Sequence, residues 1–147
     1  MKKHLHTITS IIIAIFFMYK GVDKFNDSIS ELNEIDIQNI EKGKYIYSKK
    51  GEKPSGYKIT MNTMKQSGFM KMIGIAQIVA GILIIVPISR IYGLLLLLPI
   101  IFNVFMMHLF FDNRIDENIL TGSLLLINIL LITYYNKLIF KNLILKK

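Results

Sequence analysis

The stretch IYGLLLLLPIIFNVFMMHLFF, residues 91–111, carries no charged side chain over 21 positions. A bilayer core of about 30 Å requires about 20 apolar residues in a helix that rises about 1.5 Å per residue. Hydrocarbon offers backbone amides no hydrogen-bond partner, so such a run satisfies its own backbone by forming a helix. The stretch therefore predicts a transmembrane helix.

Other uncharged runs in the chain resemble it, and hydrophobic residues make up 52% of the sequence. With their apolar flanks these runs predict spans at about 5–25, 68–87, 91–111 and 118–136. The first run is short and follows two lysines, a pattern that also suits a secretory signal peptide. No small-residue cleavage pattern follows, so we expect a retained helix. Short connections between the later spans predict an all-α, antiparallel four-helix transmembrane bundle, with residues 1–147 as a single domain.

The long connection, residues 26–67, is expected to be a polar extramembrane loop. Ser28 and Glu31 fit a capping box, which predicts a helix ending near Gly43 that lies on the membrane surface or over the mouth of the bundle. The lysine-rich stretch that follows predicts either a short hairpin centred near residues 51–56 or a solvated loop.

The basic residues mostly flank the apolar spans. The net charge of +8 is therefore expected to serve contact with anionic lipid headgroups, where Arg90 is also placed, and we predict no nucleic-acid partner. The side holding the loop has more Lys and Arg, which favours it as cytoplasmic, whereas the side holding the termini is purely cationic. We predict a multi-pass protein of the bacterial inner (cytoplasmic) membrane with both termini cytoplasmic.

The sequence contains few groups suited to catalysis or redox chemistry. It has no cysteine, which excludes thiolate catalysis and iron–sulfur ligation by this chain. In the predicted topology His6 and His108 lie near opposite membrane faces, which disfavours a bis-histidine haem. No metal-ligand spacing, glycine-rich phosphate loop or nucleophile–base pattern is recognisable. We expect a chain without a cofactor of its own that is not catalytic by itself.

Polar side chains within the spans are the candidate ligand-binding residues, because polar groups in hydrocarbon usually face the bundle interior. Lys24 ends the first span and either anchors it at the interface or lines a pocket. Gln77 lies on a stripe of small residues in the second span, which predicts either a helix-packing seam or a ligand contact. The candidates are Lys24, Gln77, Asn103, His108, Asp112 and Asn128.

The remaining candidates belong to the third and fourth spans. Asn103 and Asn128 are expected to bond to each other or to backbone that Pro99 frees, as structural contacts or as the wall of a polar cavity. His108 and Asp112 are four residues apart and share a helix face. They mark the membrane boundary or form a pair that relays a proton or holds a quinone carbonyl.

Three segments together resemble the DoxX-like family of small four-helix bacterial membrane proteins. They are GVDKF (21–25), GFMKMIGIAQIVAGILIIVP (68–87) and YGLLLLLPIIFNVFMMHLFF (92–111). The positions that match family motifs are Gly21, Lys24, Gly74, Gln77, Gly81, Gly93 and Pro99. The resemblance implies a helical bundle with short later hairpins and, in some relatives, association with quinone-linked oxidoreductase complexes. The family pattern carries over no catalytic residue, and the lack of cysteine argues against direct thiosulfate oxidation.

Three functions follow as hypotheses. The leading one is a non-catalytic accessory subunit of a quinone-linked membrane redox system, with a membrane oxidoreductase as partner and quinone as the candidate ligand. The second is a protein that binds or transports a small molecule or lipid in a polar pocket of the bundle. The third is a scaffold that docks a partner through residues 26–67. The sequence leaves a homo-oligomer open.

Overall fold

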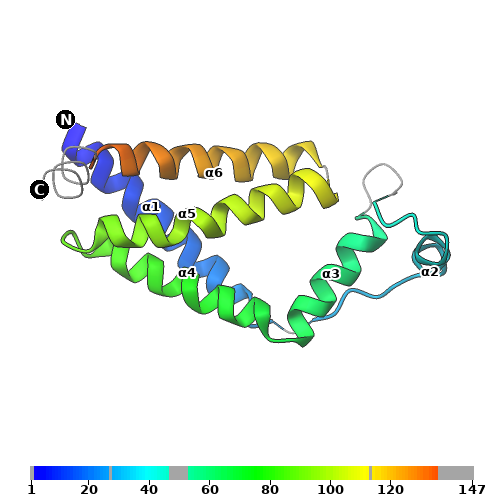
Figure 1. Cartoon of the computed structure of the whole chain (residues 1–147). Helices are drawn as coiled ribbons and strands as arrows, with labels where there is room; N and C mark the ends of the chain where they lie inside the picture. The colour runs from blue at the N-terminus through cyan, green and yellow to red at the C-terminus, as the bar shows by residue number, and fades with distance from the viewer. Residues whose placement is uncertain (1, 27, 47–52, 113, 136–147) are drawn as a thin grey trace, which may run out of the picture.

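The computed structural model describes residues 2–26, 28–46, 53–112 and 114–135. Its elements are α1 (Lys2–Asp23), α2 (Glu34–Glu41), α3 (Ser55–Gln66), α4 (Phe69–Ile85), α5 (Arg90–Met107), the π-helical turn η1 (His108–Asp112) and α6 (Ile115–Thr133). These ranges contain no strand, so the all-α class is confirmed for the described part of the chain. Figure 1 shows α2 and α3 extending from one end of the long helices.

Three helical stretches are long and apolar enough to cross a membrane, namely His4–Asp23, Arg90–Phe111 and Ile115–Thr133. A fourth span requires α3 and α4 to count together, and these two helices are bent by 76° at their junction. Alone, α4 has 17 residues, or about 26 Å at about 1.5 Å per residue, slightly less than a hydrocarbon core of about 30 Å. By length and composition, the described helices thus provide three candidate spans, or up to four if the bent pair counts as one span.

The contact between α1 and α4 is a seam of small residues. A Cβ on Gly21 would lie 2.8 Å from the Gly74 carbonyl oxygen, and a Cβ on Gly74 would lie 2.6 Å from the Gly21 carbonyl oxygen. Further along, a Cβ on Gly81 would lie 3.0 Å from the Ala14 carbonyl oxygen. The opposing atoms are backbone, so only glycine allows this approach. The packing role predicted for the small-residue stripe is confirmed, and the two helices run antiparallel.

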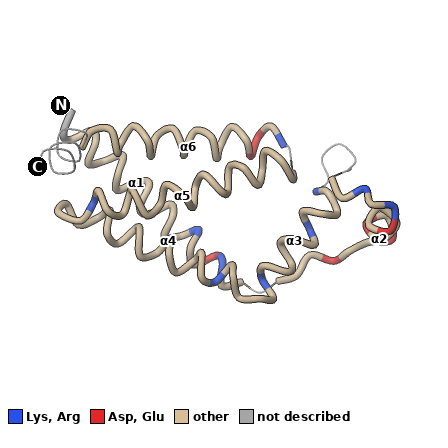
Figure 2. Tube along the Cα trace, in the orientation of Figure 1, with Lys and Arg blue, Asp and Glu red and all other residues tan. Residues whose placement is uncertain are grey.

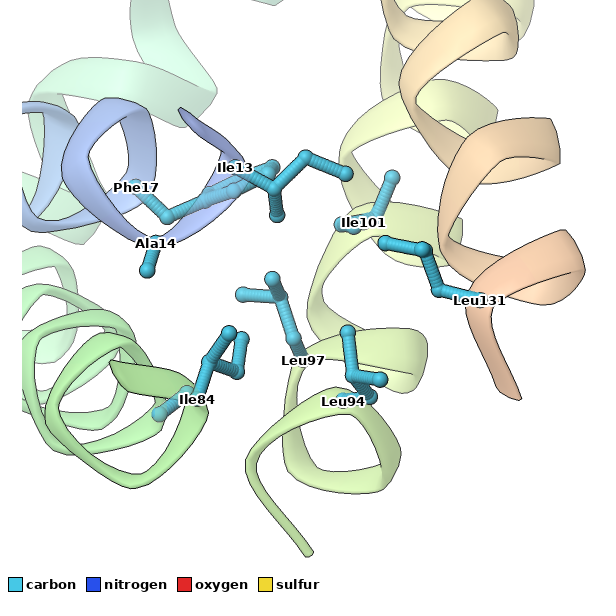
Figure 3. Packing of buried hydrophobic residues seen from close by; sticks show 9 residues of the cluster. Ile13, Ala14, Phe17, Ile84, Leu94, Leu97, Ile101 and Leu131 are labelled. Carbon is cyan, nitrogen blue, oxygen red and sulfur yellow. The ribbon is translucent and has the colours of Figure 1, made fainter. Parts of the chain in front are cut away.

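A second close contact joins α4 to α5. A Cβ on Gly93 would lie 2.6 Å from the Ala80 carbonyl oxygen and 2.8 Å from the Ile84 backbone nitrogen. Large side chains fill the space beside it. Figure 3 shows the labelled members of this cluster pointing toward one another from four helices: Ile13, Ala14, Phe17, Ile84, Leu94, Leu97, Ile101 and Leu131. The core therefore lies where α1, α4, α5 and α6 meet.

Polar groups gather where α1 begins and α6 ends. Arg90 is only 5% exposed; its Nε donates to the Ile84 carbonyl oxygen at 2.9 Å and its Nη1 to Thr7 Oγ1 at 3.2 Å. The position of Arg90 among the headgroups stays a prediction. The side chain is packed between helices, where its guanidinium satisfies a carbonyl near the end of α4 and the helix dipole favours a cation. Nearby, the His6 ring stacks on Tyr134 with centroids 4.2 Å apart.

The connection between α1 and α4 is not one extended loop, because it contains α2 and α3. The capping box predicted at Ser28 and Glu31 is wrong: α2 begins at Glu34, and its capping box is formed by Asn33 and Asp36. Segment 28–30 is instead non-helical and is hydrogen-bonded to α3. There the Ser30 backbone N–H donates to Asn62 Oδ1 at 2.9 Å, and Asn62 Nδ2 donates to the Ser30 carbonyl oxygen at 2.8 Å.

Both interpretations of the lysine-rich stretch miss α3. Residues 55–66 are helical rather than half of a hairpin or a solvated loop, while positions 47–52 lie outside the described residues. Pro54 occupies the N-cap with φ −58°, a value that proline sets in advance for an entering helix. The helix is stable here because one of its faces packs against the rest of the chain.

Asp36 joins α2 to α3. Its carboxylate accepts hydrogen bonds from Ser55 Oγ at 2.8 Å and from Lys58 Nζ at 2.6 Å, and the Asn33 backbone N–H donates to it at 3.0 Å. Burial alone would raise the pKa of Asp36, but these hydrogen bonds and the charge of Lys58 outweigh it and hold the pKa below its usual value. We call α2, α3 and this network the cap.

Candidate functional site

A cavity of about 580 Å³ lies between α3, the start of α4, the second half of α5 and η1. This volume is in the range of about 300–1,000 Å³ typical of small-molecule sites. Its walls are mostly apolar. The lining residues are Lys24, Tyr57, Thr60, Met61, Met64, Phe69, Met70, Ile73, Pro99, Ile100, Asn103, Val104, Met106, Met107, His108, Phe110 and Phe111.

Methionine dominates the lining, which contains five of the eight methionines in the chain. The methionine side chain is unbranched, flexible and polarizable, so it adapts to irregular apolar shapes and contacts aromatic rings favourably. A wall of this kind can pack against either a hydrocarbon chain or a ring. The cavity therefore suits an apolar ligand more than a small hydrated ion.

One wall of the cavity is a face of α3 that the sequence analysis missed. Tyr57, Thr60, Met61 and Met64 recur at steps of three, one and three residues and all line the cavity. This spacing is the signature of one helix face, so it was visible in the sequence. The neighbouring lysines and the Pro-Ser-Gly stretch favoured a turn instead.

Lys24 reaches the cavity from the end of α1. Its position depends on the seam, since a Cβ on Gly74 would lie 3.1 Å from the Lys24 Cβ and 3.3 Å from the Phe25 ring. The stem of Lys24 is therefore packed directly on the α4 backbone, and its side chain is half-buried. The two glycines that bring α1 against α4 thus also place a cation at the cavity.

Asn103 and His108 line the cavity from α5 and η1. Asn103 Nδ2 donates to the Pro99 carbonyl oxygen at 2.8 Å, which ties the side chain to the preceding turn. The His108 ring lies 6.0 Å from the Tyr57 ring, centroid to centroid, so α3 and η1 meet here. The π-helical turn begins at His108, and turns of this kind occur frequently at functional sites.

Gln77 and Asn128 do not line the cavity and are instead buried between helices. Gln77 is 2% exposed and Asn128 is fully buried. Asn128 Nδ2 donates to the Leu94 carbonyl oxygen at 3.2 Å. The two asparagines of the third and fourth spans therefore bond to α5 backbone at the Pro99 and Leu94 carbonyls. Neither of these is the Leu95 carbonyl that Pro99 frees, so neither of the two expected arrangements is found. Gln77 Oε1 and Asn128 Oδ1 have no hydrogen-bond partner among the described residues.

The structure thus brings three of the six candidates, Lys24, Asn103 and His108, to one cavity. The Asp112 side chain lies outside the described residues, so the predicted pairing of Asp112 with His108 stays a prediction. Within the described ranges, no group of three or more histidine, cysteine or acidic residues is arranged to hold a metal ion.

The long helices are apolar on their outer surface as well as in their core. Figure 2 shows charges mainly at helix ends and on the cap, with none along the middle of α5 and α6. Large apolar side chains cover the outside, among them Ile12, Ile75 and Leu126, exposed by 62%, 54% and 58%. Ser10 is buried instead. The fold and cavity define an all-helical protein with apolar helices of membrane length.

Comparison of the chain with protein-family models, with curated proteins and with solved structures gives no match. The DoxX-like resemblance therefore stays a prediction that rests on the three sequence segments.

Proposed function

We propose that the chain is a multi-pass protein of the bacterial cytoplasmic membrane that binds a small amphiphilic molecule in the cavity beside α3. In this proposal α1, α4, α5 and α6 form an antiparallel four-helix bundle in the bilayer. The cavity, apolar for most of its wall and bearing Lys24, Asn103 and His108, is the observation that carries the binding function.

The apolar exterior supports the membrane part of the proposal. On α1 the residues Ile8, Ile12 and Ile15 are each more than half exposed. An exposed apolar surface continuous over several helices is unfavourable in water and indicates contact with lipid or protein. In lipid, helix association depends on close packing and interhelical hydrogen bonds. The Gly21–Gly74 contact and the Asn128 hydrogen bond are of these two kinds.

The composition of the cavity supports the binding part. Pockets for small molecules typically combine apolar walls with a few polar groups that fix orientation. Here the polar groups come from four separate places, namely α3, α5, η1 and the end of α1. A ligand that touched all four would also hold the cap against the long helices.

The test uses the full chain purified in lipid nanodiscs, with mass spectrometry of the small molecules that co-purify. Met64→Trp places an indole in the cavity, whereas Met72→Trp places one on the exposed face of α4, outside the lining. We expect the wild type and Met72→Trp to retain the same small amphiphilic molecule and Met64→Trp to lose it. Equal retention by both variants would contradict the proposal.

A second candidate, the accessory subunit of a quinone-linked redox system, rests on the same cavity. Lys24 and His108 are suitable hydrogen-bond donors for quinone carbonyls, and methionine and phenylalanine side chains suit a flat ring. We expect affinity purification in mild detergent to recover a membrane oxidoreductase. Purification of the chain alone, together with normal quinol oxidation in membranes that lack it, would argue against this role.

A further inference from the structure

Resting on the proposed binding function, we infer that the ligand carries an anionic head, a carboxylate or a phosphate, which Lys24 holds while an apolar chain lies against the methionines. The charges of the lining lead to this inference. Lys24 is the one lysine or arginine among the described lining residues, and these include no aspartate or glutamate. A neutral ligand would leave this cation facing an apolar space.

The surroundings of Lys24 increase its preference for an anion. Lys20 and Lys65 both lie close enough to repel the Lys24 ammonium, and Asp23 is the acid that attracts it. Lys65 Nζ is tied to the Ser28 carbonyl oxygen, which holds it near the junction of α3 and α4. Three ammonium groups against one carboxylate leave a local excess of positive charge that an anionic head would offset.

The position of Lys24 is fixed before any ligand arrives. Its Cβ is in contact with the α4 backbone at Gly74, so binding has to order only the outer part of the side chain. Ordering a long side chain on binding costs conformational entropy, and a packed stem reduces this cost. A hydrogen bond between an ammonium and an anion is also about twice as strong as one between neutral groups.

The location favours an amphiphile. Lys24 follows directly after α1, at the end of the long helices that carries the cap, where a membrane surface would lie in the proposed arrangement. Beyond it, the walls of the cavity are formed by Met70, Ile73, Ile100 and Val104, all without charge. A head at Lys24 and a hydrocarbon chain along these residues would match the polarity of the cavity from end to end.

The experiment measures competition in the full chain in nanodiscs. A diazirine-bearing stearic acid is photo-crosslinked to the protein, and oleate, oleyl alcohol or oleoyl lysophosphatidate is added as competitor. We expect oleate or the lysophosphatidate to displace the probe at a concentration about tenfold lower than oleyl alcohol, which corresponds to about 1.4 kcal/mol. Crosslinked peptides should come from α3, α4 and α5.

Variants assign the preference to one residue. Lys24→Gln should abolish the tenfold preference for the anionic competitors over oleyl alcohol, whereas Lys24→Arg should keep it. The control Lys42→Gln, which removes an exposed charge on the cap, should leave the preference unchanged. If Lys24→Gln does not fold, the arginine variant and the wild-type competition still decide the question. Equal displacement by oleate and oleyl alcohol in the wild type would overturn the anionic head while leaving the proposed function intact. Displacement by none of them would count against both.

Discussion

The two ends of α4 pack in opposite ways. From Gly74 to Gly81 its backbone touches the backbone of α1, and a single added carbon would collide with carbonyl oxygens at 2.6–3.0 Å. Before Gly74, next to Met70, the chain bends by 76° into α3 and a cavity of about 580 Å³ remains. Small residues close the first region, whereas long flexible residues line the second. Residue size along one helix therefore separates a structural seam from a space that can hold a ligand.

The largest effect is expected at the seam between α4 and α5. Gly93→Ala would place a Cβ 2.6 Å from the Ala80 carbonyl oxygen, and overpacking of this kind costs about 1–3 kcal/mol. Gly122→Ala is the matched control, because its Cβ would meet the ring edge of Phe105 at 3.2 Å rather than backbone. Helicity followed by circular dichroism during heating in detergent should show a clearly lower Tm for Gly93→Ala alone.

The next effect concerns the cap and its pH dependence. The pKa of Asp36 is lowered in the folded chain, so its stabilising contribution is present above the usual pKa of about 4 and is lost as the pH falls through the lower folded value. Amide exchange, corrected for the intrinsic rate, should show α2 and the start of α3 losing protection below about pH 4. Asp36→Asn should lack this protection at pH 6 already. Unchanged protection of the cap at pH 3 would contradict the role given to this carboxylate.

A smaller effect is expected at the polar end. Arg90→Met would remove the hydrogen bonds to the Ile84 carbonyl oxygen and to Thr7, and we expect a loss of about 1–2 kcal/mol because the carbonyl keeps no donor. Arg90→Lys should recover only part of this, since an ammonium lacks the planar fork. The stabilities of both variants can be measured in the same heating experiment. Equal stability of the wild type, Arg90→Met and Arg90→Lys would contradict the role of Arg90 in capping α4.

The smallest effect is expected at Asn103. Its hydrogen bond to the Pro99 carbonyl oxygen is on an exposed side chain, so Asn103→Ala should change the free energy of unfolding by less than about 1 kcal/mol. Asn128→Ala, at a fully buried position, should cost more. A larger loss for Asn103 than for Asn128 would show that the cavity wall, and not the helix contact, stabilises α5.

The sequence allowed the long helices to be predicted because their signal is local. An uncharged run such as residues 91–111 specifies a helix without reference to the rest of the chain. The small residues Gly74 and Gly81 likewise predicted a packing seam. The cap was predicted only in part. A helix ending near Gly43 was expected and α2 ends at Glu41, whereas α3 was missed, because it depends on contacts from Asp36 and segment 28–30 that are distant in sequence.

The same limit applies to the cavity. Lys24, Asn103 and His108 were candidates because each is a polar side chain within a predicted span. That they share one cavity follows from the bend between α3 and α4 and from the close contact at Gly74, which sequence spacing does not reveal. Gln77 and Asn128 are also polar residues within predicted spans, but their side chains point into contacts between helices rather than into the cavity.

The central claim is that the long helices cross a bilayer, and the absence of cysteine from the sequence gives a direct test. Single cysteines at Ile88, in the turn between α4 and α5, and at Lys42, in the cap, are labelled with a membrane-impermeant maleimide in intact cells and in inverted vesicles. The account predicts that the two positions react from opposite sides, with Ile88→Cys facing the cytoplasm in the favoured orientation. Labelling of both from the same side, or release of the chain from membranes by alkaline carbonate, would contradict it.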